Sequence, residues 1–140
     1  MNKFGLKIAL FVLILFVIAK TITFYLPYHW GNPWYSTKID YLENSDNKNY
    51  NTYFFGTSRV YRQINPVVFD SVCNKNSIEK FSSFNLGAQA TFCPQTYFLY
   101  ENFLKSELSN GVKYCFLELT HIGSINDYFL HREQTNYWLD

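Results

Sequence analysis

The longest hydrophobic stretch of the chain lies at its N-terminus. Two lysines precede an unbroken apolar run from Ile8 to Ala19, and apolar residues dominate again after Lys20. A helix that crosses a bilayer needs about 20 residues, so the stretch as far as Leu26 is long enough to span it. We therefore expect residues 1–26 to be a transmembrane signal anchor.

The residues that flank this stretch predict its orientation. Lys3 and Lys7 lie on the N-terminal side, which favours a cytoplasmic N-terminus and an extracytoplasmic remainder. Lys20 lies toward the outer end, where its long side chain can reach the interface. An aromatic belt follows, formed by Tyr25, Tyr28, Trp30 and Trp34. The alternative is a cleaved signal peptide with small residues near Ala19, and it also places the body of the protein outside the cytoplasm.

The hydrophobic pattern changes twice after the apolar stretch. Residues 27–49 are rich in turn-forming residues and show no sustained period, which is typical of a juxtamembrane connector. From residue 50 onward, short apolar runs typical of strands cover Asn51–Phe55, Lys80–Asn85 and Val112–Leu119. The last run is nearly continuous from Tyr114 to Leu117, which favours a strand that is buried on both faces.

Helical patterns separate these strands. Asn65 as N-cap and Pro66 as the first helical residue predict one helix, whose apolar side comprises Val67, Val68 and Val72. A second helix is predicted from about Pro94 to Ser109, with Tyr97, Tyr100, Leu104 and Leu108 at helical spacing. Two successive strand–helix–strand units predict a parallel sheet in an α/β fold.

The composition of the chain argues against several classes of protein and ligand. Aromatic residues make up 21% of the chain, which favours a packed core over disorder. The formal net charge is +1 without a basic cluster beyond the N-terminus, so we expect no nucleic-acid partner. The three cysteines, Cys73, Cys93 and Cys115, lack metal-ligand spacing, and we expect neither a metal nor a cofactor. A disulfide between Cys73 and Cys93 would suit an oxidising compartment.

Polar segments follow each predicted strand, and the carboxyl ends of parallel strands are where α/β proteins place their sites. These segments are Gly56–Arg59, Asn85–Gly87 and Thr120–His121. Ser58 lies in a tight turn, where it is either a nucleophile close to oxyanion-binding N–H groups or a plain turn or capping serine.

Three further side chains near these segments have two interpretations each. His121 is either a base that faces the same cleft or a histidine bonded to backbone at a strand end. Arg59 and Arg62 either bind an anionic substrate or form surface ion pairs. A phosphate-cradling turn at Gly56–Arg59 is a weaker interpretation, because the further glycines and the lysine of a P-loop are missing.

The segments Phe54–Arg59 and Phe84–Gly87 resemble the first two blocks of the SGNH/GDSL hydrolase superfamily. More narrowly, they resemble membrane-anchored members whose first block reads Gly-Ser/Thr-Ser-Arg. The resemblance covers roughly residues 51–119. It implies a three-layer α/β/α, flavodoxin-like fold with a five-stranded parallel sheet. It also implies that Ser58 is the nucleophile and that the backbone N–H groups of Ser58 and Gly87 form part of the oxyanion hole.

The sequence departs from the superfamily pattern in its last two blocks. Gly123–Asp127 has one residue too many for the third block and comes late, so Asn126 is either a third oxyanion donor or a turn residue. The fourth block, Asp-x-x-His, is absent, because Asp127 and His131 are four residues apart. Without it, Ser58 lacks an identified activator, and an isolated hydroxyl is a weak nucleophile.

Together these patterns predict that residues 50–140 are an incomplete SGNH-like domain. The resemblance implies the N-terminal part of a membrane-anchored ester hydrolase or O-acyltransferase that acts on acyl esters of envelope glycans. We expect this part to be inactive without the missing Asp-x-x-His. The alternative is a non-catalytic, membrane-tethered binding or assembly protein with the same fold.

Overall fold

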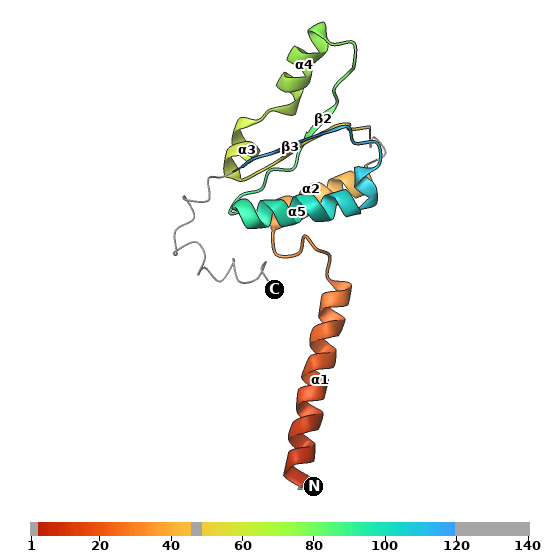
Figure 1. Cartoon of the computed structure of the whole chain (residues 1–140), viewed down its shortest axis with the longest axis vertical. Helices are drawn as coiled ribbons and strands as arrows, with labels where there is room; N and C mark the ends of the chain where they lie inside the picture. The colour runs from red at the N-terminus through yellow and green to blue at the C-terminus, as the bar shows by residue number, and fades with distance from the viewer. Residues whose placement is uncertain (1–2, 46–48, 120–140) are drawn as a thin grey trace. The chain divides into compact units, whose positions relative to one another are not determined.

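A computed structural model of the protein describes residues 3–45 and 49–119. The chain divides into two compact units, Met1–Trp30 and Gly31–Asp140. The first unit contains the helix α1 (Lys3–Tyr25), and all the other elements belong to the second unit (Figure 1).

Helix α1 is long and apolar enough to cross a membrane. It has 23 residues, and none of its side chains is buried. Its two threonines satisfy their hydroxyls within the helix, since Thr21 and Thr23 donate to the backbone oxygens of Val17 and Ala19 at 2.8 and 2.9 Å. The predicted apolar helix is therefore confirmed, with bounds that begin five residues before Ile8.

The second unit contains a three-stranded parallel sheet with the order β2-β1-β3. Its strands are β1 (Thr52–Phe55), β2 (Ser83–Asn85) and β3 (Tyr114–Leu117). Its helices are α2 (Pro33–Asn44), α3 (Ser58–Gln63), α4 (Pro66–Asn76), α5 (Cys93–Lys105) and the 3-10 turn η1 (Glu107–Ser109). The predicted α/β class and the parallel pairing are confirmed.

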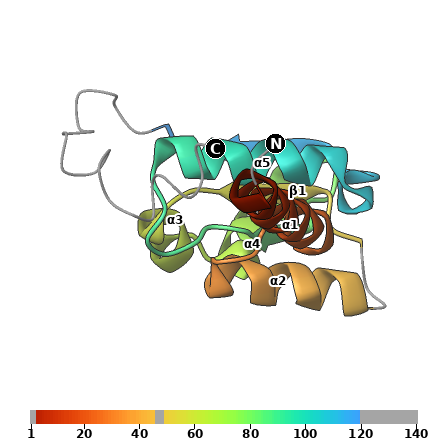
Figure 2. The same ribbon diagram turned by 90° about the horizontal axis from the view of Figure 1, so that it is seen from below.

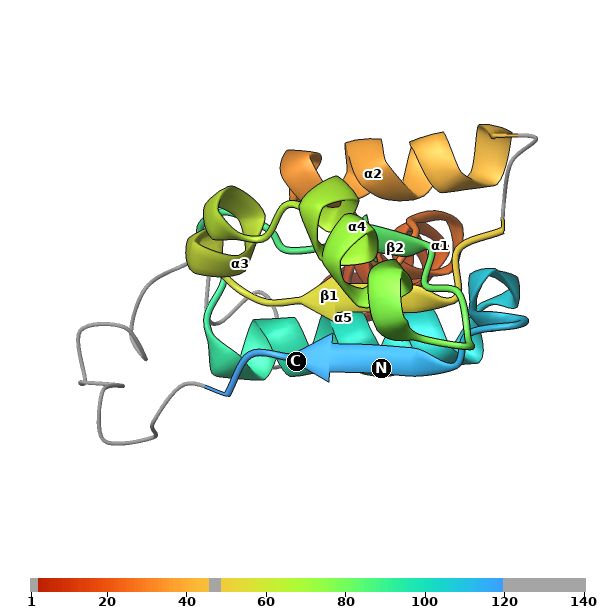
Figure 3. The same ribbon diagram turned by 90° about the horizontal axis from the view of Figure 1, so that it is seen from above.

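Helices cover both faces of the central strand, as Figures 2 and 3 show from opposite sides. Tyr53 and Phe55 of β1 face α5, where their rings lie 4.8 and 5.2 Å from the ring of Phe103. Phe54 faces the opposite side, and its ring meets Phe69 of α4 at 5.0 Å. Because all four residues of β1 are buried, this strand anchors the core.

The expectation of an irregular connector over residues 27–49 is wrong, because α2 occupies much of it. Asn32 caps the helix by accepting the Tyr35 N–H at 3.1 Å, and Pro33 is its first residue. Its buried residues, Tyr35, Ile39 and Leu42, follow helical spacing. Polar residues between them conceal this period in a hydropathy profile. Helix α2 packs beside α5 on the same face of the sheet (Figure 2).

Strand β3 and helix α4 differ from their predicted burial. Strand β3 is an edge strand of the described sheet, and Tyr114 and Phe116 are exposed rather than buried. The valines of α4 also point to solvent, because the helix is anchored by Phe69 and by Asp70, which accepts the backbone N–H and the hydroxyl of Ser83.

Helix α5 is rotated from the face that its aromatic residues predict. Tyr97 and Leu104 are exposed, whereas the buried residues are Gln95, Thr96, Leu99 and Phe103. Glu101 and Lys105, which are four residues apart on the exposed side, form an ion pair at 3.5 Å. Cys73 and Cys93 are both free, so the disulfide that the sequence left open is not present.

Candidate functional site

Two turns meet at the carboxyl end of the sheet. The backbone of residues 86–88 continues alongside the end of β1, since Leu86 donates to the Phe54 oxygen at 2.8 Å and Ala88 donates to the Gly56 oxygen at 2.9 Å. The turn that contains Ser58 and the turn that contains Gly87 are therefore neighbours. Strand β3 ends beside them, where the Glu118 N–H donates to the Phe55 oxygen at 2.9 Å.

Ser58 is the first residue of α3, directly after the turn that ends the central strand. Thr57 is the N-cap, and its hydroxyl accepts the Arg59 N–H at 3.3 Å. The side chain of Ser58 is partly exposed and makes no hydrogen bond to another described residue. Since Thr57 performs the capping, the Ser58 hydroxyl is not used to cap α3 within the described part of the chain.

Glu118, which is not among the residues predicted for the site, holds this turn in place. One carboxylate oxygen accepts both the N–H and the hydroxyl of Thr57, at 2.7 and 2.9 Å. The other oxygen pairs with the Arg59 guanidinium at 2.7 Å. Glu118 follows β3 immediately and is mostly buried, so it links the end of one edge strand to the turn beyond the central strand.

Asn85 performs a similar task for the second turn. Its amide nitrogen donates to the backbone oxygens of Val60 and Ile64 at 2.9 and 2.8 Å, which ties α3 to the end of β2. Its amide oxygen accepts the Gly87 N–H at 2.8 Å. The N–H group that the resemblance assigns to the oxyanion hole is therefore already engaged, and it would have to leave or share the Asn85 oxygen to bind an oxyanion.

Both glycines are required by close packing against α3. A Cβ at Gly56 would lie 2.3 Å from a methyl of Val60 and 2.6 Å from the Glu118 carboxylate. A Cβ at Gly87 would lie 2.6 Å from the backbone nitrogen of Tyr61. The two glycines thus allow the two turns to approach the helix that begins at Ser58.

A lysine from α2 completes the surroundings of the second turn. The Lys38 ammonium donates to the Gly87 oxygen at 2.5 Å and lies 4.5 Å from the centre of the Tyr61 ring. Burial lowers the pKa of Lys38 from 10.5 to about 8. This lysine was also absent from the predicted site, because the segment around it was expected to be an irregular connector.

The arginines favour the structural interpretation. Arg59 forms the ion pair with Glu118, and Arg62 donates to the side-chain oxygen of Gln89 at 3.2 Å. The other predicted residues, His121 and Asn126, lie outside the described residues, as do Asp127 and His131. The described residues contain no group of His, Cys, Asp and Glu placed to hold a metal ion.

In this arrangement the partly exposed hydroxyl of Ser58 lies at the start of α3. Hydrogen bonds from Glu118 and Asn85 fix the two neighbouring turns. Glu118 could have been noticed in the sequence as a charged residue directly after an apolar strand, at the edge where sites form. Its partners could not, because the contact joins residues 61 positions apart. No family model, curated protein or solved structure matches the chain.

Proposed function

We propose that this protein is a membrane-anchored, SGNH-type serine ester hydrolase or O-acyltransferase, with Ser58 as its nucleophile. The observation that supports the proposal best is the hydroxyl of Ser58, which has no hydrogen-bond partner among residues 3–45 and 49–119 and lies at the first position of α3, beyond the carboxyl end of the central strand. In a parallel α/β sheet this is the edge where substrates bind.

The chemistry would proceed by acyl transfer. The Ser58 oxygen attacks the carbonyl carbon of an acyl ester while a base removes the hydroxyl proton. The carbonyl oxygen becomes an oxyanion, which is stabilised by the N–H of Ser58 and by that of Gly87. Collapse of the tetrahedral intermediate expels the alcohol, which takes up the proton. Water or a second alcohol then removes the acyl group from Ser58.

The backbone N–H groups of Ser58 and Gly87 differ in whether they already have a hydrogen-bond partner among the described residues. The Ser58 N–H belongs to the first turn of α3, where an intrahelical partner is not available. The Gly87 N–H first has to leave Asn85. Residues 31–45 and 49–119 contain no histidine, so a histidine base would have to come from outside the described part of the second unit.

The membrane helix supports a location at the cell envelope. With Lys3 and Lys7 on the cytoplasmic side, the second unit would lie outside the cytoplasm. By resemblance to membrane-anchored members of the superfamily, the substrates are acyl esters of envelope glycans.

The test is covalent labelling of the full-length protein in detergent with a fluorophosphonate probe, followed by intact mass and peptide mapping. We expect one adduct, on Ser58, and none in Ser58→Ala. Ser71→Ala is the matched control, because Ser71 lies on the surface of α4 with its hydroxyl donated to the Val68 oxygen at 2.8 Å. An adduct that persists in Ser58→Ala would contradict the assignment of the nucleophile.

The second candidate function is a non-catalytic, membrane-tethered binding or assembly role. It is favoured by the engaged Gly87 N–H, which an oxyanion hole would need to be free. A folded full-length protein that gives no adduct at any probe concentration would support this role and exclude the hydrolase.

A further inference from the structure

A hollow lies between the start of α2 and α3, separate from the Ser58 turn but next to Gly87. Its volume is about 320 Å³. The residues that line it are Pro33, Trp34, Thr37, Lys38 and Tyr61. None of these side chains is acidic, and two are aromatic, so the lining combines one cation with flat apolar surfaces.

The charge of Lys38 is not neutralised by a carboxylate in the described part of the chain. Its ammonium contacts the Gly87 oxygen and the Tyr61 ring, and the ion pairs of the described residues do not include it. An ammonium has three N–H donors, and the Gly87 oxygen takes only one of them. Burial without a counter-ion lowers the pKa of Lys38 to about 8. A partly buried cation beside an open hollow is a favourable place for an anion.

We propose that this hollow binds an oxyanion, phosphate or carboxylate, that is attached to a sugar ring of the substrate. Lys38 supplies the charge. Trp34 is partly exposed and offers a flat face against which a ring can stack. The part of the proposal that concerns the substrate rests on the proposed function. The binding of the anion itself does not.

The position of the hollow explains why such a subsite would assist the reaction. Lys38 contacts the carbonyl oxygen of the same residue whose N–H would stabilise the oxyanion. An anion bound by Lys38 would therefore hold one end of the substrate beside Gly87, because the Lys38 ammonium contacts the backbone oxygen of that residue. Binding energy from a remote group then positions the ester for attack by Ser58.

The same anion could come from a lipid headgroup. The chain carries a helix, α1, that is long and apolar enough to cross a membrane. The experiment therefore compares soluble probes with vesicles. Phosphatidylglycerol vesicles that compete with the soluble probe would assign the site to a headgroup and overturn the sugar-linked assignment.

Binding is measured by calorimetry on the full-length protein in detergent, in the Ser58→Ala background so that turnover plays no part. The probes are glucose 1-phosphate, inorganic phosphate and glucose. We expect glucose 1-phosphate to bind at least about tenfold more tightly than either of the others, because it combines the charge with the ring. Equal affinity for glucose and glucose 1-phosphate would overturn the proposal.

Two variants separate the cation from the ring. Lys38→Gln should lower the affinity for glucose 1-phosphate by about tenfold or more. Lys105→Gln, which removes an exposed lysine that pairs with Glu101, should leave it unchanged. Trp34→Leu should reduce the affinity for glucose 1-phosphate to that for phosphate, and it keeps the proposal testable if Lys38→Gln does not fold. An unchanged affinity in Trp34→Leu and in folded Lys38→Gln would refute the site. Since Ser58 is already replaced, failure of catalysis and failure of binding are distinguished.

Discussion

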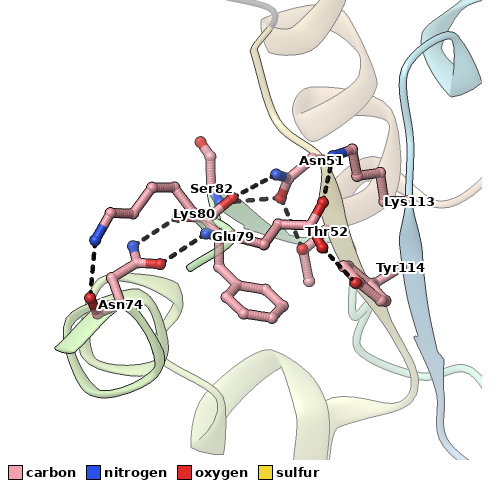
Figure 4. Close-up of polar contacts among 9 residues, drawn as sticks. Asn51, Thr52, Asn74, Glu79, Lys80, Ser82, Lys113 and Tyr114 are labelled. Atoms are coloured by element: carbon pink, nitrogen blue, oxygen red, sulfur yellow. Dashed lines mark hydrogen bonds and ion pairs between the residues drawn. The ribbon is translucent and has the colours of Figure 1, made fainter. Parts of the chain in front are cut away.

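The two ends of the sheet use similar polar residues for different purposes. At the amino end, shown in Figure 4, Asn51 precedes β1 and joins the segments that lead into the other two strands. Its side chain accepts the Ser82 N–H and the Thr52 hydroxyl at 3.0 and 2.8 Å, and it donates to the Lys80 oxygen at 2.7 Å. Its backbone oxygen accepts the N–H groups of Lys113 and Tyr114.

At the carboxyl end, Asn85 also makes three side-chain hydrogen bonds, which join α3 and the Gly87 turn to the end of β2. The Ser58 hydroxyl has no hydrogen-bond partner among the described residues. Thr96, on the first turn of α5, is buried with its hydroxyl unpartnered within the same part of the chain. Buried polar groups are usually satisfied, so exceptions call for an explanation.

Because of this difference we expect a structural role for the amino end of the sheet and propose that chemistry occurs at the carboxyl end. A network that satisfies all its members joins strands and offers nothing to a ligand. Hydrogen bonds that fix the turns around a hydroxyl position its residue without engaging the hydroxyl itself. The carboxyl end of the described sheet has hydrogen bonds of this second kind.

Gly87→Ala should cause the greatest loss of stability. The new Cβ would lie 2.6 Å from the Tyr61 backbone nitrogen, so α3 itself would have to move. Overpacking of this kind costs about 3 kcal/mol in the free energy of unfolding. Gly111→Ala is the control, since its Cβ meets no atom within 4 Å, although its φ of +83° costs about 1 kcal/mol. Urea unfolding followed by circular dichroism measures both, and equal losses would show that α3 is not packed against this turn.

The two asparagines provide a matched pair for the second prediction. Asn85→Ala and Asn51→Ala each remove three hydrogen bonds, so each should lower the free energy of unfolding by about 2 kcal/mol. Of these two variants, only Asn85→Ala should slow the fluorophosphonate reaction at Ser58, because Asn85 bonds to the backbone of α3 and Asn51 does not. Similar labelling rates in the two variants would remove the functional distinction between the ends of the sheet.

The two carboxylates that bridge strands allow a finer comparison. Glu118→Gln loses the charge in a mostly buried contact with Thr57 and Arg59, and should cost about 1 kcal/mol and slow labelling of Ser58. Glu79 bonds to Lys113 and to the Tyr114 hydroxyl, and the bond to Lys113 lowers the pKa of Glu79. This contact is exposed, so Glu79→Gln should change stability less and leave labelling intact.

The salt dependence of the two glutamate variants provides the control. The exposed pair at Glu79 is screened by salt, so the stability difference for Glu79→Gln should disappear at high ionic strength. The lowered pKa of Glu79 means that its contribution is present above its usual pKa of 4.5 and is lost as the pH falls through the lowered value. An effect of Glu79→Gln on labelling would contradict the structural role of the amino end.

Local signals predicted much of this fold. Runs of strand-forming residues placed three strands within a few residues of their observed positions, and Asn65-Pro66 located the start of α4. The residues beyond each strand could be assigned to one edge, because parallel strands all end there. The meeting of the Ser58 and Gly87 turns followed from that rule alone.

The errors arose where tertiary contacts override local patterns. Helix α2 escapes prediction because its apolar residues are separated by polar ones and because Pro33, its first residue, belongs to a segment rich in turn-forming residues. The apolar side of α4 is exposed to solvent. A sequence does not show that the helix contacts the sheet through Phe69, which packs on Phe54, and through Asp70, which bonds to Ser83. Glu118 and Lys38 act through contacts with residues distant in the chain.

The remaining prediction concerns the charge of Lys38 and its dependence on pH. Burial lowers the pKa of Lys38 from 10.5 to about 8 in the folded protein. Between these two values the unfolded chain binds a proton that the folded protein has released, so the free energy of unfolding should rise with pH across this window. Lys38→Met removes the titrating group and should not show this rise. The only titratable side chain that contacts the ammonium among the described residues is Tyr61.

Other groups titrate in the same range, so the measurement is the difference between the two proteins. Burial raises the pKa of Cys115 and of Tyr53, the latter to about 12, and both effects should cancel in the subtraction because neither residue contacts Lys38. Urea unfolding at about pH 7 and about pH 9.5 should show wild type gaining stability relative to Lys38→Met. A difference that does not change with pH would mean that the ammonium is well hydrated, and the hollow beside it would then lose the uncompensated charge that makes it attractive to an anion.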